Sequence, residues 1–181
     1  MSCNLFPNER IDSTYRIDFE ALYREGIRGV IFDIDNTLVP HGAPADDRAV
    51  ALFERLHALG LKTVLLSNNG EARVKPFAEK TEAQYLYKAG KPKKTGYVKA
   101  MEIMGTDNKD SIFVGDQIFT DVWGANRAGL HTILVGKIHP KEEIQIVLKR
   151  MLEFFIVGAF RLGRKIKGEP EARHVMSGER S

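Results

Sequence analysis

Cysteine is almost absent from this chain of 181 residues, in which Cys3 is the single example. A disulfide framework and a cysteine-rich zinc site are therefore excluded. Long apolar runs are missing too, because the longest covers only residues 154–160, whereas a membrane-spanning helix needs about 20 residues. The first residues, MSCNLFPNERID, lack the apolar stretch of a signal peptide. These absences predict a cytoplasmic protein.

A strong excess of charge of one sign is absent as well, because the formal net charge is +3. Hydrophobic residues make up 43% of the chain and charged ones 28%, which is typical of a folded globular protein. Residues 1–136 contain 17 basic and 18 acidic side chains, whereas residues 137–168 contain eight basic and three acidic ones. A near-neutral body does not favour nucleic-acid binding, but the basic segment behind it favours contact with an anionic surface.

Short apolar runs alternate with helix-like stretches along most of the chain. Strands are predicted over residues 29–33, 62–67, 84–87, 111–115 and 131–135, and helices over 19–24, 47–59, 71–79, 94–104 and 120–128. This alternation predicts an α/β fold with a mainly parallel sheet in a three-layer α/β/α arrangement. The expected divisions are an N-terminal segment with a short helix (1–26), a core (27–140), a basic amphipathic helix (141–168) and a disordered tail (169–181). The first dozen residues are expected to be loosely held.

Polar and charged side chains follow the predicted strands at their carboxyl ends, where parallel sheets bind ligands. They are Asp33, Asp35, Thr37, Ser67, Asn68, Lys91, Asp116 and Asp121. Crowded carboxylates repel one another unless a cation neutralises them, and oxygen ligands without a His or Cys cluster suit Mg²⁺. An aspartate can also act as a nucleophile, with a hydroxyl and an amine holding the phosphoryl oxygens. The sequence therefore predicts phosphoryl-transfer chemistry at this edge.

Four motifs resemble, in order and spacing, those of the haloacid dehalogenase (HAD) superfamily phosphatases. They are DIDNT at 33–37, the serine of SNN at 67–69, the lysine of GKPKK at 90–94 and GDQIFTD at 115–121. The resemblance covers roughly residues 27–136. The stretches VIFDIDNTLV, LLSNN, KAGKP and VGDQIFTDVWGANRAG further resemble the small YqeG-type phosphatases of subfamily IIIA, relatives of the mitochondrial phosphatidylglycerophosphate phosphatase.

The resemblance implies a Rossmann-like HAD fold and a covalent mechanism. Asp33 would be the nucleophile that forms an aspartyl-phosphate. Asp35 would protonate the leaving alcohol and then deprotonate the water that hydrolyses the intermediate. Members that break carbon–halogen bonds lack this second acid, so Asp35 favours hydrolysis of a phosphate monoester.

The same resemblance implies the remaining roles in the site. Asp33, the backbone carbonyl of Asp35 and Asp116 would bind Mg²⁺. Ser67, Asn68 and Lys91 would hold the phosphoryl group. Thr37 would hydrogen-bond within the nucleophile loop, and Asp121 would support the water shell of the metal or Lys91.

Less specific interpretations stay open for some of these residues. Ser67 alone would suit a helix N-cap. A receiver-type signalling domain shares the parallel sheet, the acidic cluster, Mg²⁺ and the lysine, but it is phosphorylated once and does not turn over substrate. The order of Asp33, Ser67 and Lys91 favours the phosphatase, and turnover against stoichiometric phosphorylation separates the two.

The spacing of the motifs leaves no room for a cap domain. The 29 residues between Thr37 and Ser67, and the 23 between Ser67 and Lys91, are fewer than the roughly 40 that an independent cap needs. Capless HAD phosphatases have open sites that suit large or surface-bound substrates, or they close the site by oligomerising. Phosphatidylglycerophosphate is the leading substrate, with a soluble phosphomonoester or a polynucleotide 3′-phosphate as alternatives.

The basic segment 141–168 bears on the same choice. Its apolar residues share one helical face up to Glu153, and beyond that residue the helix is apolar all round until four basic residues follow. Such a helix suits the anionic inner face of the cytoplasmic membrane, although packing on the core or against a second subunit would use the same face.

Overall fold

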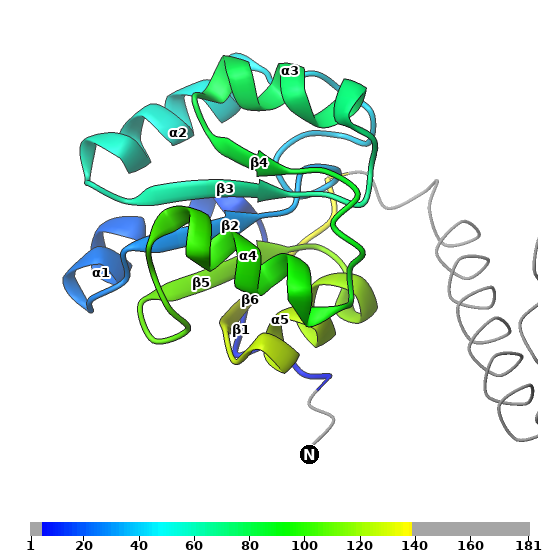
Figure 1. Cartoon of the computed structure of the whole chain (residues 1–181). Coiled ribbons are helices and arrows are strands. Elements are labelled where there is room, and N and C mark those ends of the chain that lie inside the picture. The colour runs from blue at the N-terminus through cyan, green and yellow to red at the C-terminus, as the bar shows by residue number, and fades with distance from the viewer. Residues whose placement is uncertain (1–4, 139–181) are drawn as a thin grey trace, which may run out of the picture. The chain divides into compact units, whose positions relative to one another are not determined.

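One six-stranded parallel sheet organises the chain (Figure 1). The computed structural model describes residues 5–138, so the segments predicted at 141–168 and 169–181 lie outside the described residues. The strands lie in the order β1-β6-β5-β2-β3-β4, and every neighbouring pair is parallel. Their bounds are β1 Glu9–Ile11, β2 Gly29–Phe32, β3 Lys62–Leu66, β4 Gln84–Leu86, β5 Ser111–Gly115 and β6 His131–Val135. The predicted α/β class is confirmed.

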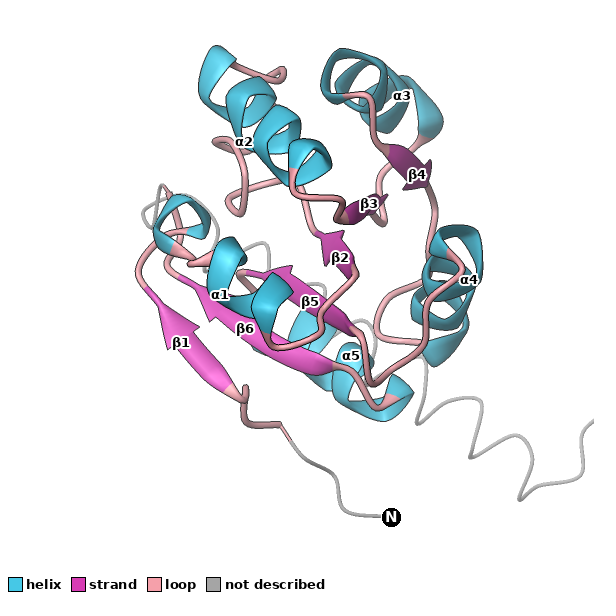
Figure 2. Cartoon of the chain, turned by 90° about the vertical axis from the view of Figure 1, so that its left-hand side faces the viewer, coloured by secondary structure: helices cyan, strands magenta, loops and turns pink. Residues whose placement is uncertain are grey.

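Helices cover both faces of this sheet. Their bounds are α1 Phe19–Arg24, α2 Asp47–Ala58, α3 Glu71–Thr81, α4 Lys94–Met104 and α5 Trp123–Ala128, with a 3₁₀ turn η1 at Thr14–Arg16 and a π-helical turn η2 at Ile118–Val122. Figure 2 shows α1 and α2 on one side of the sheet and α4 and α5 on the other. The expected three layers are therefore present. None of the helices described is long and apolar enough to cross a bilayer.

Burial on both faces explains why the central strands are continuous apolar runs. Phe32 of β2 packs toward α2, with its ring centroid 5.3 Å from that of Phe53. The adjacent Ile31 belongs to the cluster on the opposite face, together with Tyr97 of α4 and Phe113 of β5. Alternate residues of one strand thus enter the two separate cores, because side chains on a strand alternate between its faces.

The path of the chain reverses at β2, and this places the site. From β2 the chain proceeds outward through β3 and β4, then returns to β5 on the other side of β2 and continues to β6. The strand order therefore switches direction between the carboxyl ends of β2 and β5, and sheets of this type bind ligands in the crevice at such a point. Between Thr37 and Ser67 the structure has only α2 and β3, and between Ser67 and Lys91 only α3 and β4, so no cap is inserted.

The N-terminal segment differs from the expectation of a loosely held end. Glu9–Ile11 forms the edge strand β1, which pairs with β6 from Ile133 to Val135. The backbone N–H of Asn8 also donates to the Thr132 carbonyl at 3.1 Å. A strand this short, with two charged residues among its three, has no alternating apolar pattern, so the sequence does not reveal it.

Candidate active site

The loop after β2 holds the first two acids. Asp33 stays tied to the sheet, because its backbone N–H donates to the Val114 carbonyl of β5 at 3.0 Å. The chain then turns sharply at Asn36, whose φ of 62° lies in the left-handed region that asparagine tolerates better than most residues. The Asn36 N–H closes this turn by donating to the Val39 carbonyl at 2.7 Å. Asp33 and Asp35 are both buried as a result, at 7% and 8% exposure.

Two residues of the N-terminal segment hold this loop in place through hydrogen bonds. The Thr14 hydroxyl donates to the Thr37 carbonyl at 2.6 Å, and the Tyr15 hydroxyl donates to the Leu38 carbonyl at 2.6 Å. Both carbonyls belong to the loop that carries the two acids. The η1 turn is therefore part of the support of the site.

Lys91 joins the ends of two strands through one buried ammonium. Its Nζ lies 2.5 Å from Asp33 Oδ1 and 2.7 Å from Asp121 Oδ1. Its side chain is 4% exposed, so these ion pairs are almost fully removed from water. The predicted partners Asp33, Lys91 and Asp121 are thus brought together.

Asn68 fixes the backbone of Lys91 from the neighbouring loop. The Asn68 side-chain oxygen accepts from the Lys91 N–H at 2.8 Å, and its amide nitrogen donates to the Lys91 carbonyl at 3.1 Å. Both ends of the amide are engaged by the backbone of Lys91, and the expected contact of Asn68 with the phosphoryl group stays a prediction. Ser67 is buried beside it, and its hydroxyl accepts from the Asn69 N–H at 3.2 Å.

The end of β5 supplies the other two acids. Asp116 follows the strand directly, and the η2 turn brings Asp121 back so that its Oδ2 accepts from the Gln117 N–H at 3.1 Å. The predicted helix therefore begins earlier, with both the Asp121 and Val122 N–H groups donating to the Gln117 carbonyl. Gly115 makes this return possible, because a Cβ there would lie 2.6 Å from Asp121 Oδ2.

Three buried carboxylates consequently converge. One oxygen from each of Asp33, Asp116 and Asp121 lies within 4.8 Å of the others. The Thr37 hydroxyl is 3.5 Å from Asp116 Oδ1, while Asp116 Oδ2 is buried without a hydrogen-bond partner. An all-oxygen donor set with an unpartnered buried oxygen fits a hard divalent cation such as Mg²⁺.

The electrostatics of the cluster fit the same conclusion. Burial raises the pKa of Asp33 from 3.8 to about 7, although Lys91 opposes the shift. Burial, with repulsion from Asp121 and Asp33, raises the pKa of Asp116 to about 8. Burial alone would lower the pKa of Lys91, but Asp121 and Asp33 outweigh it and raise that pKa. A cation bound among the three carboxylates would favour their ionised forms.

Asp35 lies outside this cluster of carboxylates. Its oxygens accept from the Gly42 N–H at 2.8 Å, from Asn69 Nδ2 at 2.6 Å and from a guanidinium nitrogen of Arg73 at 2.8 Å. The contacts of Asn69 and Arg73 with Asp35 were not anticipated from the sequence. The one feature of the sequence that points to Asn69 as a site residue is its place in the SNN motif, directly after Asn68.

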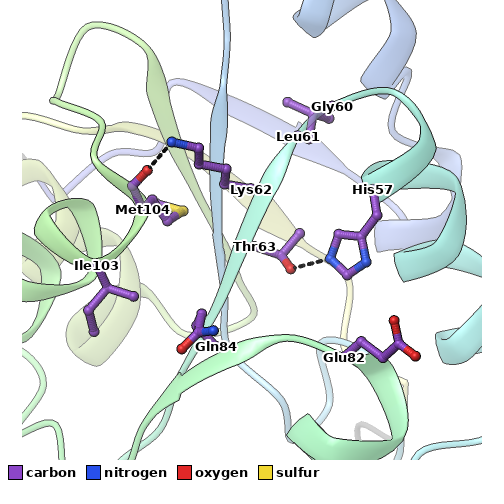
Figure 3. A pocket seen from close by; sticks show the side chains of 9 residues that line it. All are labelled: His57, Gly60, Leu61, Lys62, Thr63, Glu82, Gln84, Ile103 and Met104. Carbon is purple, nitrogen blue, oxygen red and sulfur yellow. Dashed lines mark hydrogen bonds between the residues drawn. The ribbon is translucent and has the colours of Figure 1, made fainter.

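A second hollow lies at the opposite edge of the sheet, at the start of β3 and β4 (Figure 3). It has a volume of about 330 Å³. Three of its polar side chains already have partners, since Thr63 Oγ1 is 2.8 Å from His57 Nε2 and Lys62 Nζ donates to the Met104 carbonyl at 2.5 Å. None of the acids of the cluster lines it, so the cluster at the carboxyl edge is the better candidate.

Comparison with known proteins decides the family. The family model of the haloacid dehalogenase-like hydrolases matches residues 41–129. The chain is also 35% identical over 164 residues to the probable phosphatase YqeG of Bacillus subtilis, covering 90% of this chain and 95% of the relative. The chain belongs to the haloacid dehalogenase-like hydrolases. It is a HAD-type phosphatase, as the four motifs indicated.

One plant enzyme and one algal enzyme are further relatives of this HAD phosphatase. Phosphatidylglycerophosphate phosphatase 1 of Arabidopsis thaliana is 28% identical over 84% of the chain, and that of Chlamydomonas reinhardtii is 31% identical over 78%. The matched regions make up 47% and 56% of those enzymes, so the chain spans about half their length. Among solved structures, an uncharacterized protein from Listeria monocytogenes has the same fold, with a TM-score of 0.52 and 22% identity over 64% of this chain and 84% of that one.

Proposed function

We propose that this HAD phosphatase hydrolyses a phosphate monoester through an aspartyl-phosphate on Asp33, with Mg²⁺ as cofactor and phosphatidylglycerophosphate as substrate. The observation that carries the chemistry is the position of Asp33, held between the Lys91 ammonium and the carboxylates of Asp116 and Asp121. A nucleophile needs this combination of fixed position and neutralised surroundings.

The first step transfers the phosphoryl group to the protein. An oxygen of Asp33 forms a bond to phosphorus while the bond from phosphorus to the alcohol oxygen breaks. Asp35 donates a proton to that oxygen, and the alcohol leaves. Lys91 stays beside Asp33 throughout and offsets the negative charge on the phosphoryl oxygens.

The second step returns the site to its starting state. Asp35, now ionised, accepts a proton from a water molecule whose oxygen bonds to phosphorus, and the bond to Asp33 breaks. Inorganic phosphate leaves. The contacts of Asp35 with Asn69 and Arg73 keep its carboxylate at a fixed position at the carboxyl edge of the sheet during both proton transfers.

Asp33, the backbone carbonyl of Asp35 and Asp116 would hold Mg²⁺, with Asp116 contributing its unpartnered buried oxygen. Asp121 would support Lys91 or the water shell of the metal. Bound there, the ion would supply positive charge that favours ionised Asp33 and offsets charge on the transferring group. Ser67 is proposed to bind a phosphoryl oxygen through its hydroxyl. Asn68 supports Lys91 through the two hydrogen bonds to its backbone.

Two observations favour a lipid as the phosphate monoester. The plant and algal relatives are named for phosphatidylglycerophosphate, and no cap is inserted between the motifs, so a bulky or surface-bound substrate can reach the crevice. The test is phosphate release from phosphatidylglycerophosphate in mixed micelles beside a panel of soluble phosphomonoesters, with and without Mg²⁺. Asp33→Asn is the control.

Rapid Mg²⁺-dependent turnover of the lipid, lost in Asp33→Asn, is the expected result. Turnover of soluble esters without hydrolysis of the lipid would contradict phosphatidylglycerophosphate as the substrate. It would still agree with the aspartyl-phosphate mechanism. A single phosphorylation of the wild type without turnover would contradict the mechanism and favour the receiver-type switch.

A further inference from the structure

Three segments beside the active site contain basic and exposed apolar residues but no acidic ones. They are residues 87–94 after β4, 117–120 after β5 and 136–138 after β6, all at the carboxyl edge of the sheet. Together they contain five lysines and no aspartate or glutamate. We name these three segments the basic–apolar rim.

The middle segment exposes large apolar side chains next to the acids. Ile118 is 42% exposed and Phe119 is 37% exposed, and only Gln117 separates them from Asp116. A single exposed apolar residue needs no explanation, but two adjacent ones at the mouth of an active site are informative. Tyr87, 42% exposed, adds a third from the segment after β4.

The backbone holds this apolar pair in place. The π-helical turn η2 begins at Ile118 and is closed by two hydrogen bonds to the Gln117 carbonyl. The Tyr97 hydroxyl of α4 donates to the Thr120 carbonyl at 2.6 Å, immediately after Phe119. The pair is therefore presented by an anchored turn that α4 supports.

The lysines lie on both sides of the pair. Lys88 is exposed, and its backbone is fixed because its N–H donates to the Asn69 carbonyl at 2.9 Å. Lys93 and Lys94 are exposed at the start of α4. Lys137, after β6, lies near enough to Asp116 to lower the pKa of that carboxyl.

The first of these segments also contributes a residue to the active site. Lys91 lies in the first segment of the rim, and its ammonium contacts Asp33 and Asp121. A surface that covers the rim would therefore lie across the mouth of the crevice. A phosphate carried on that surface would face Asp33 without leaving it.

Resting on the proposed function, we propose that the basic–apolar rim docks this domain onto an anionic lipid bilayer. Ile118 and Phe119 enter the headgroup layer, and the exposed Lys88, Lys93 and Lys94 meet lipid phosphates. The complementary charge favours a bilayer, since each basic residue near such a surface adds attraction and amphipathic apolar side chains enter its interface. The phosphate monoester of a lipid headgroup then reaches Asp33 from within the membrane surface.

Flotation of the full chain with vesicles tests the docking without any turnover. Vesicles of phosphatidylcholine and phosphatidylglycerol in equal parts are compared with phosphatidylcholine alone. The wild type is expected to float with the anionic vesicles, and less so at high salt. Ile118→Ser with Phe119→Ser should lower the partition coefficient at least about tenfold.

Ile103→Ser is the matched control, because Ile103 is 40% exposed against 42% for Ile118 and lines the hollow at the opposite edge of the sheet. It should float like the wild type. All variants should keep wild-type kcat/KM on a soluble phosphomonoester, which shows that fold and site are intact.

Equal flotation of wild type and the double variant would overturn the proposal, because any binding would then come from another part of the chain. Failure of the wild type to float would overturn it too, and would favour a protein partner for this surface. Neither result depends on the substrate, so failure of the docking remains distinct from failure of lipid hydrolysis in the assay above.

Discussion

Lys91 Nζ lies 2.5 Å from Asp33 Oδ1, in a buried ion pair that ties the loop after β4 to the end of β2. The same ammonium reaches Asp121, yet one positive charge faces three converging carboxylates. Three buried carboxylates beside one ammonium destabilise the fold unless some of the carboxylates are protonated or a cation is bound. The site therefore couples metal binding, protonation and folding stability.

Replacing Asp116 with asparagine should separate metal binding from stability. Asp116→Asn removes the carboxylate with the unpartnered oxygen, so the Mg²⁺ concentration for half-maximal activity should rise at least about tenfold. In EDTA near pH 8 the same variant should melt at a higher temperature than the wild type, because the fold no longer has to bury a carboxyl that is ionised in the unfolded chain. Asp12→Asn, at an exposed site that forms an ion pair with Arg16, should change neither. An unchanged Mg²⁺ requirement in Asp116→Asn would contradict the assignment.

The pH dependence of stability follows from the raised pKa of Asp116. Its carboxyl has a pKa of about 8 in the folded protein against an ordinary 3.8, so the folded state binds more protons between these values. Stability in EDTA should therefore fall as pH rises through this window, and the wild type should lose several degrees of Tm relative to Asp116→Asn between about pH 5 and pH 8. Mg²⁺ should reduce the loss. A difference between wild type and variant that is independent of pH would contradict the prediction.

Asn68 should act through Lys91. Asn68→Ala removes both side-chain hydrogen bonds to the Lys91 backbone, so the ammonium loses its fixed position beside Asp33. We expect kcat/KM to fall about tenfold or more, with little change in Tm because Asn68 is exposed. Steady-state kinetics on a soluble phosphomonoester measure the effect. Wild-type kinetics in Asn68→Ala would show that Lys91 is held without this amide.

A stability prediction away from the site concerns the end of α3. Glu82 has a φ of 53°, in the left-handed region where glycine is favoured. Glu82→Gly should therefore stabilise the fold by about 0.5–1 kcal/mol. Glu79→Gly, inside the same helix, should destabilise it by about 1 kcal/mol. Thermal unfolding distinguishes the two, and shifts of the same sign would contradict the explanation.

The fold could be predicted because its central strands and helices have strong apolar periodicity. The run Gly29-Val-Ile-Phe is buried on both faces, and the helix predicted from Lys94 to Met104 has the same bounds in the structure. β1 could not be predicted, since Glu9 and Arg10 are charged and the strand is stabilised by pairing with β6, more than 100 residues away. The π-helical turn is equally hidden, because its local pattern is that of an ordinary helix start.

The strand-end acids and Lys91 could be anticipated because parallel strands bring their carboxyl ends together. The partners of Asp35 could not. Arg73 lies in the first turn of α3, and its contact with Asp35 depends on how α3 packs beside the loop after β2. The bracing of the loop by Thr14 and Tyr15 likewise depends on tertiary packing across 23 residues of sequence. Membrane attachment through 141–168 stays a prediction outside the described residues.

In the proposed mechanism Asp33 carries the phosphoryl group during turnover. The most direct measurement is to mix the enzyme and Mg²⁺ with substrate bearing a radiolabelled phosphate monoester, quench with acid within a single turnover and digest the protein. We expect label on the peptide containing Asp33, released by hydroxylamine as expected for an acyl phosphate and absent from Asp33→Asn. Product formation by the wild type without any protein-bound label, or label that persists in Asp33→Asn, would contradict it.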